Sequence, residues 1–289
     1  MIVKAVQQIM LGTVTRTETE ALQTLQKIKF CGYDGIELNG FMIRKTGLFV
    51  RLLTKAAGMP CGKGGAYDWP ELVKAADLSV VSLHEDLGTI KKDTDGVIGR
   101  AKALSTRNVV ITGMYNFDYT DPETLSGLCQ DLNRYGEALS RSGIRLLYHN
   151  HNVELSRVQS SAKAPGGGTA YDFLLAHTDP SNVSFEFDSY WFTEAGANAA
   201  KWMEKLGSRM KLWHINDRGR RQIGKAITPI LTSDSMELGY GNMDLDTLSE
   251  AAKKNGIEAV ILESHRNHVD GDPIKSLGLS AAYLNRMFG

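Results

Sequence analysis

Near its middle the chain reads Leu146-Leu147-Tyr148-His149-Asn150-His151-Asn152-Val153-Glu154, passing directly from three apolar residues into a polar sequence. An apolar run that ends this abruptly is typical of a buried strand leaving the core. Side chains on an extended strand alternate with a period of two, so His149 and His151 are expected on the same side. Two neighbouring imidazoles at a strand end can bind a metal or transfer protons.

The same strand pattern recurs along the whole chain and alternates with segments of helical periodicity. The predicted strands are residues 3–10, 33–39, 78–84, 108–112, 144–149, 183–188, 209–214 and 258–263. The predicted helices are residues 19–31, 45–57, 91–105, 121–142, 169–177, 196–207, 246–255 and 273–287. Regular alternation of this kind predicts parallel βαβ units, and a closed (β/α)8 TIM barrel explains the count better than an open sheet.

The alternatives to a barrel find little support in the sequence. No G-x-G-x-x-G follows the first strand, which weakens a dinucleotide-binding fold. The glycine-rich segments 62–65 and 166–168 lack the lysine-serine pair and the preceding strand of a P-loop. Without a Pro/Ser-rich linker or a change in composition, we predict an α/β protein with one TIM-barrel domain spanning residues 1–289.

Composition excludes several classes of partner. Lys plus Arg and Asp plus Glu each total 33, so there is no basic excess to attract nucleic acid or anionic lipid. The N-terminus lacks the pattern of a signal peptide, and no run approaches the roughly 18 apolar residues of a membrane span. Three widely spaced cysteines suggest neither a disulfide framework nor a thiolate zinc site. We expect a cytoplasmic protein with no nucleic-acid or membrane partner, for which a homo-oligomer is one possible state.

Polar side chains stand at the carboxyl ends of most predicted strands, and these ends meet at one face of a closed barrel. The residues in question are Glu37, His84, His149, His151, Asp188, His214 and Glu263. Four consecutive strands ending in His149, Asp188, His214 and Glu263 offer imidazoles and carboxylates, which suit a borderline divalent ion such as Mn²⁺, Zn²⁺ or Co²⁺. We therefore predict one divalent metal site from these four residues.

Several motifs beyond residue 145 give the chain a family resemblance. They are Tyr148-His149-Asn150-His151 with Glu154, Asp188-Ser189-Tyr190-Trp191, His214-Ile215-Asn216-Asp217, Gly239-Tyr240-Gly241-Asn242-Met243-Asp244 and Ile261-Leu262-Glu263. Their order and spacing resemble the xylose isomerase-like TIM barrels, and within these the sugar phosphate isomerase/epimerase group. The resemblance implies one divalent metal, Mn²⁺ foremost with Zn²⁺, Co²⁺ or Mg²⁺ as alternatives, and a sugar or keto-sugar substrate.

One position departs from the family pattern. The resemblance implies metal ligation by a glutamate, an aspartate, a histidine and a glutamate from successive strands, and Asp188, His214 and Glu263 match the last three. His149 stands in place of the first glutamate, which in ketose epimerases faces the last one across the substrate, so that the two exchange protons at one substrate carbon. The His-Asn-His variant resembles inosose dehydratase-like members, whose chemistry includes elimination.

These observations lead to a hypothesis of function with assigned roles. The protein would be a metal-dependent isomerase or epimerase that removes a proton next to a carbonyl, with a lyase or dehydratase acting on a keto-sugar or keto-cyclitol as the alternative. His151 would be the mobile base, His149 a metal ligand close to the chemistry, and Glu263 a bridge between metal and substrate. A non-catalytic sugar-binding barrel is a further alternative. A three-metal endonuclease, which shares the barrel, needs several more site histidines and a DNA-binding surface, and a chain with seven histidines in all and zero formal net charge fits it poorly.

A second set of residues is expected to contact the substrate, although each has an ordinary structural alternative. These are Glu37, His84, Glu154, Trp191, Asp217 and Arg218. Trp191 could stack on a sugar face or simply pack, and Arg218 could hold a phosphate or lie in a solvated loop. Glu186, two residues before Asp188 on the same strand face, is expected to be structural.

Overall fold

Eight strands close into a parallel barrel in this computed structural model, which describes residues 1–44, 52, 67–159, 168–222 and 224–289. The barrel strands are β1 (Val3–Gln7), β2 (Gly35–Asn39), β3 (Ser79–His84), β4 (Asn108–Thr112), β5 (Arg145–His149), β6 (Val183–Asp188), β7 (Met210–Ile215) and β10 (Ala259–Leu262). Their order around the barrel is β1-β10-β7-β6-β5-β4-β3-β2, so each strand neighbours the next barrel strand in sequence. This order confirms the predicted TIM barrel.

Two compact units make up the chain. The first contains residues 1–81, 214–250 and 258–289, and the second contains residues 82–213 and 251–257. The single domain predicted over residues 1–289 stays a prediction.

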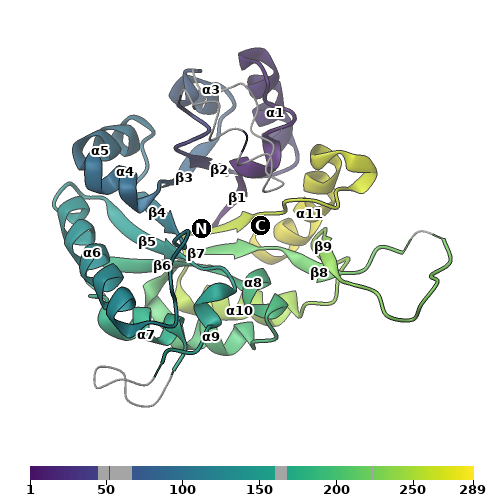
Figure 1. Ribbon diagram of the computed structural model, residues 1–289. Coiled ribbons are helices and arrows are strands. Elements are labelled where there is room, and N and C mark those ends of the chain that lie inside the picture. The colour runs from purple at the N-terminus through teal and green to yellow at the C-terminus, as the bar shows by residue number, and fades with distance from the viewer. Residues whose placement is uncertain (45–51, 53–66, 160–167, 223) are drawn as a thin grey trace. The chain divides into compact units, whose positions relative to one another are not determined.

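In the first unit, β1 pairs in parallel with both β2 and β10. Helix α1 (Glu18–Phe30) packs against α3 (Trp69–Ala75) and α11 (Pro273–Phe288). The long segment after β7 holds a small antiparallel hairpin of β8 (Asp217–Gly219) and β9 (Asp234–Met236), and the loop of this hairpin extends away from the strands (Figure 1). Short 3-10 turns cover Gln8–Leu11 and Val269–Gly271.

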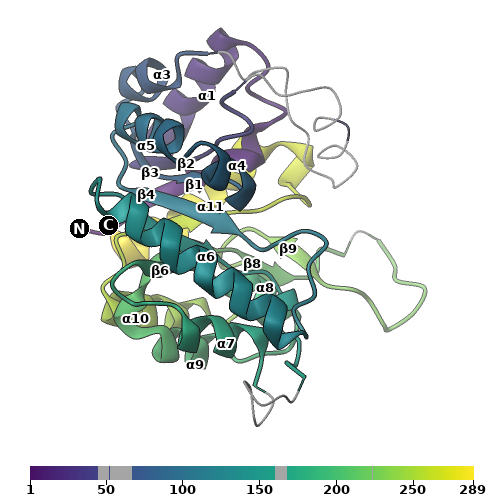
Figure 2. The same cartoon turned by 60° about the vertical axis from the view of Figure 1, so that its left-hand side comes forward.

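In the second unit, β4 pairs in parallel with β3 and β5, and β5 with β6. The helices are α4 (Leu87–Lys92), α5 (Thr94–Ala103), α6 (Pro122–Ser140), α7 (Ala170–His177), α8 (Ser189–Glu194) and α9 (Ala199–Leu206). The longest of them, α6, packs against β5 and α7 and is seen lengthwise in Figure 2. Further 3-10 turns cover Val153–Leu155 and Gly207–Arg209, and helix α10 (Leu245–Asn255) runs from the first unit into the second.

An aromatic cluster covers β6 and explains why α7, α8 and α9 pack there. The Tyr171 ring lies edge-on to Phe185, Phe192 and Trp202, with centroids 5.0–5.5 Å apart. Edge-to-face pairs of this kind add about 0.5–1.5 kcal/mol each beyond the burial of their area. The cluster fixes β6, and with it the residue at the end of that strand.

Most predicted elements are confirmed, and local side-chain bonds account for the differences. The first predicted strand stops at Gln7, whose side chain accepts the Ile9 N–H at 2.7 Å and begins a 3-10 turn. The helix predicted over residues 91–105 corresponds to α5 and only the last two residues of α4, because Asp93 separates the two helices and caps α5 through the Gly96 N–H. The helix predicted at residues 45–57 lies, except for Leu52, outside the described residues.

Three predicted helix ends are confirmed by glycines in the left-handed region. Gly32, Gly143 and Gly256 have φ values of 98°, 76° and 72°, which a residue without Cβ adopts without strain. Helices α3 and α8 were not predicted, because both are short.

None of the helices in the described part of the chain combines the length and apolar character needed to cross a membrane.

Gly35 in β2 is a sensitive point of the first unit's packing. A Cβ at this position would lie 2.9 Å from Val81 Cγ1 and 3.0 Å from the Ser79 carbonyl oxygen. We expect Gly35→Ala to lower the free energy of unfolding by about 1–3 kcal/mol, since overpacking forces neighbouring atoms to move. Gly99→Ala is the control, because a Cβ there meets nothing within 4 Å in helix α5 and should stabilise by roughly 0.5–1 kcal/mol. Denaturant unfolding measures both, and equal effects would contradict the packing argument.

Candidate metal centre and active site

The four predicted metal ligands all lie at the carboxyl ends of barrel strands, where the sequence places them. His149 and Asp188 are the last residues of β5 and β6, His214 is the fifth residue of β7, and Glu263 directly follows β10. All four side chains are buried. Buried imidazoles and carboxylates require partners, because removing such groups from water is costly.

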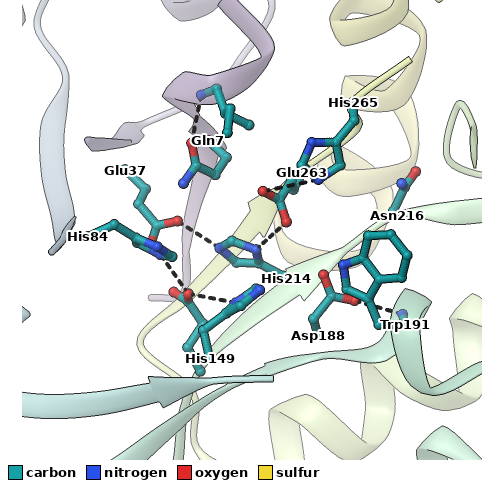
Figure 3. Close-up of polar contacts among 12 residues, drawn as sticks. Gln7, Glu37, His84, His149, Asp188, Trp191, His214, Asn216, Glu263 and His265 are labelled. Atoms are coloured by element: carbon teal, nitrogen blue, oxygen red, sulfur yellow. Dashed lines mark hydrogen bonds and ion pairs between the residues drawn. The ribbon is translucent and has the colours of Figure 1, made fainter. Parts of the chain in front are cut away.

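In the first unit, His214 lies between two glutamates (Figure 3). Its Nε2 is 2.7 Å from Glu37 Oε1, and its Nδ1 is 2.9 Å from Glu263 Oε2. The other Glu263 oxygen is 3.5 Å from His265 Nε2. A neutral imidazole carries a single N–H, so it can donate to only one of these carboxylates. This arrangement suits a cation that is bound by one ring nitrogen of His214 and by one of the two carboxylates. The other carboxylate then orients the ring.

In the second unit, Glu186 is the buried carboxylate that contacts the His149 ring. Glu186 Oε2 lies 3.1 Å from His149 Nδ1 and 2.8 Å from His84 Nε2. The sequence suggested a structural role for Glu186, and its only signal was its position two residues before Asp188 on the same strand face. The structure shows that it holds two of the predicted site histidines in place.

Asp188 is fixed at both its backbone and its side chain. The Asn150 side chain donates to the Asp188 carbonyl and accepts the Asp188 N–H, both at 3.0 Å. Asp188 Oδ1 accepts the Trp191 N–H at 3.1 Å, which makes Asp188 the N-cap of α8 (Figure 3). Asn150 was missed by the sequence reasoning, although it stands between the two histidines of the opening motif.

His151 lies just beyond β5 and is partly exposed, unlike His149. Its ring is edge-on to His149 with centroids 5.0 Å apart, and 5.7 Å from the Trp191 ring. Its backbone N–H donates to Glu154 Oε2 at 2.9 Å. Trp191, expected to contact substrate or to pack, therefore lies beside the predicted base.

Glu154 is fully buried and hydrogen-bonded to Tyr148, whose hydroxyl donates to Glu154 Oε1 at 2.7 Å. Burial raises the pKa of Glu154, although its hydrogen bonds from Tyr148 and the His151 backbone partly oppose the shift. Burial also raises the pKa of the Tyr148 hydroxyl well above its usual value, and the nearby Glu154 charge adds to the effect.

Two groups of buried side chains could hold a metal ion among the described residues. His149, Asp188, His214 and Glu263 each offer a ligand atom within 4.8 Å of the others, and so do His84, His149, Glu186 and His214. The first group supplies two imidazoles and two carboxylates, a donor set suited to Zn²⁺, Mn²⁺ or Co²⁺. The second has one carboxylate for three imidazoles, so it compensates a divalent charge less well.

Asp217 and Arg218, the remaining substrate candidates, lie in β8 of the first unit. The Asp217 carboxylate accepts backbone N–H groups from Arg218, Gly239, Gly241 and Met243 at 2.8–3.1 Å. It therefore ties the hairpin to the segment that leads into α10. The Arg218 side chain is partly exposed.

The fold and the ligand cluster define a (β/α)8 barrel with a buried metal-binding centre at its strand ends. The chain belongs to the xylose isomerase-like TIM barrel family, whose model matches residues 25–287. Curated relatives include inosose dehydratases, and the matched regions span 33–65% of those proteins. One from Bacillus licheniformis is 24% identical over 212 residues, which is 71% of this chain and 65% of that protein.

Solved structures show the same fold. A sugar phosphate isomerase/epimerase from Parabacteroides distasonis superposes with a TM-score of 0.76 at 21% identity, covering 97% of this chain and 92% of that one. The IOLI protein, solved with a bound zinc atom, gives a TM-score of 0.67 at 16% identity and covers both chains completely.

The Asp217 carboxylate should control the order of the segment from Gly239 to Met243. Asp217→Asn leaves one acceptor oxygen on the side chain, so at least one pair of hydrogen bonds from backbone N–H groups is lost. The rate of amide exchange in that segment should therefore rise about tenfold, which corresponds to a loss of about 1.4 kcal/mol in the free energy of local opening. Hydrogen exchange with mass spectrometry measures the change. Asp244→Asn, which alters only the cap bond to the Thr247 N–H, is the matched control. Unchanged protection in Asp217→Asn would contradict the role assigned to this carboxylate.

The raised pKa of Glu154 predicts a pH dependence of stability. The folded state binds the proton more tightly than the unfolded state, so this group's contribution is greatest below the ordinary glutamate pKa of 4.5 and declines as pH rises through the higher folded value. The stability of wild type relative to Glu154→Gln should therefore fall between about pH 5 and about pH 8. Denaturant titrations at both pH values measure the difference.

Asp121 at the N-cap of α6 is the control of opposite sign. Hydrogen bonds from Thr124 lower the pKa of Asp121, so its contribution is complete above the ordinary aspartate pKa and should not decline over the same range. A Glu154 difference that stays constant, like the one expected for Asp121→Asn, would refute the assignment.

Proposed function

We propose that this protein is a divalent-metal-dependent enzyme that removes a proton next to the carbonyl of a sugar or keto-sugar, and thereby isomerises or epimerises it. The observation that carries the proposal is a buried His/Asp/His/Glu set with a further, partly exposed histidine immediately beside it. The ligand set would bind the cation, and the additional histidine is available for proton transfer. Manganese is the ion we expect, with zinc, cobalt or magnesium as alternatives.

The proposed ligands are His149, Asp188, His214 and Glu263. Their donor chemistry fits the ion, and each histidine has a buried glutamate on one ring nitrogen: Glu186 at His149 and Glu37 at His214. Such carboxylates fix the orientation of a ligating ring and raise its basicity. A cation bound there would act as a Lewis acid beside a carbonyl and lower the free energy of the anion that forms when the neighbouring carbon loses its proton.

His151 is the proposed base. Histidine has an ordinary pKa near neutrality and can take up a proton from carbon and return it without large tuning. Returning the proton to the opposite face gives epimerisation, and returning it to the next carbon gives isomerisation. Glu263 would contact the substrate as well as the ion, and Trp191, beside His151, offers an apolar face to a sugar ring.

The burial of the other candidates supports indirect roles for several of them. Glu37 and Glu154 are fully buried, and we assign them to orienting histidines rather than to substrate contact. His84 shares its carboxylate with His149 and is buried beside it. Arg218 remains the candidate for an anionic group of the substrate.

A dehydratase acting on a keto-sugar or keto-cyclitol is the second candidate function. It is favoured by His149, which replaces one of the two glutamates that a simple two-base epimerisation needs, and by the inosose dehydratases among the relatives. Loss of the same proton followed by departure of a β-hydroxyl group as water would give elimination from the same site. The two reactions share their first step and differ in the product.

The role of His151 can be separated from metal binding. We expect His151→Ala to lower the rate of C–H exchange of keto-sugars and inososes in D₂O by about 10²–10⁴-fold, because a general base of this kind contributes that much. Its metal content should stay at one equivalent, whereas Asp188→Ala should lose both metal and exchange. NMR follows the exchange and elemental analysis follows the metal.

His177→Ala, at an exposed position in α7, is the matched control and should retain both properties. Loss of metal in His151→Ala would overturn the division between ligand and base. Sugar binding by the metal-loaded wild type without any exchange would favour a non-catalytic binding barrel instead.

A further inference from the structure

Glu154 is hydrogen-bonded to the backbone of His151, the proposed base, just beyond the end of β5. Tyr148 and His149 are neighbours on β5, so their side chains lie on opposite faces of the strand. Tyr148 and Glu154 are both fully buried, and their side chains are hydrogen-bonded to each other. A carboxylate with no exposed surface does not meet a substrate, and therefore acts through its hydrogen-bond partners.

Both oxygens of Glu154 have defined partners. Oε2 accepts the His151 N–H at 2.9 Å, and Oε1 accepts the Tyr148 hydroxyl at 2.7 Å. The two bonds connect the end of β5 to the 3-10 turn at residues 153–155, which fixes the backbone on both sides of His151. Charge-assisted hydrogen bonds of this kind are stronger than neutral ones.

A second tyrosine extends the chain of hydrogen bonds. The Tyr119 hydroxyl is 3.0 Å from the Tyr148 hydroxyl and accepts the Met114 N–H at 2.7 Å. Because the Tyr148 proton is directed at Glu154, Tyr119 supplies the proton of the bond between the two hydroxyls. The resulting sequence runs from Tyr119 through Tyr148 to Glu154 and ends at the His151 backbone.

Gly113, just after β4, gives independent evidence that this cluster is closely built around the His151 ring. A Cβ at Gly113 would lie 2.7 Å from Glu154 Oε1, 3.1 Å from the Tyr119 hydroxyl and 3.5 Å from His151 Nδ1. The backbone just after β4 therefore passes against the carboxylate and the imidazole together, and a side chain at this position would force the carboxylate to move.

From this geometry we propose that Glu154, held by Tyr148 and Tyr119, is a positioning residue that sets the backbone and ring of His151 for proton transfer. The proposal rests on the function proposed above only in taking His151 as the base; the positioning itself is a statement about structure. It replaces the expectation that Glu154 contacts the substrate.

Tyr148→Phe tests the proposal with the smallest change, since it removes one hydroxyl and keeps the ring. Misplacement of a catalytic group by a fraction of an ångström to 1 Å costs about 10–10²-fold, so we expect kcat for C–H exchange to fall about tenfold, with KM and metal content nearly unchanged. Glu154→Gln should have a larger effect of the same kind. Tyr171→Phe is the matched control, because that buried hydroxyl has no hydrogen-bond partner among the described residues.

A readout independent of activity separates the two proposals. In ¹⁵N-histidine-labelled protein at one fixed pH, Tyr148→Phe and Glu154→Gln should shift the His151 imidazole resonances, identified by their loss in His151→Ala, while Tyr171→Phe leaves them in place. Shifted resonances with unchanged exchange would support positioning and refute His151 as the base. Resonances unchanged in Tyr148→Phe would overturn the positioning proposal, whatever the activity, even if Glu154→Gln does not fold.

Discussion

The pairing of each buried histidine with a buried glutamate is the interaction on which the candidate site depends. His214 faces Glu37 and Glu263 in the first unit, and His149 shares Glu186 with His84 in the second. An imidazole removed from water needs a hydrogen-bond partner, and a carboxylate needs one even more. The strand ends can carry this many buried ionisable groups only because each histidine is a hydrogen-bond partner of a glutamate.

The same arrangement separates ligands from the proposed base. A glutamate on one nitrogen of His149 and of His214 fixes each ring in a single orientation, as a ligating histidine requires. His151 is held differently, through its backbone N–H and the close approach of Gly113, and its ring is partly exposed. The candidate ligand His149 and the proposed base His151 thus lie two residues apart, at the end of β5 and just beyond it.

Much of the fold followed from the sequence because the signals are local. Apolar runs ending in polar residues located every barrel strand, and Gly32, Gly143 and Gly256 ended helices where a positive φ was needed. The elements that were predicted wrongly or not at all also depend on local signals, but these signals are weaker. The Asp93 side chain broke one predicted helix, and α8 begins immediately at the end of β6 with Asp188 as its cap, leaving no loop to mark it.

The sequence by itself determined the barrel, and it indicated His149, Asp188, His214 and Glu263 as candidate ligands, since strand periodicity and the parallel topology bring such residues to one rim. Only the tertiary structure decided which residues support them. Glu37, Glu186, Asn150 and Tyr148 act across distances of up to 177 residues in sequence, and such partners depend on the register of neighbouring strands rather than on any local pattern. Glu154 was expected to contact the substrate, and its complete burial led us to propose instead that it positions His151.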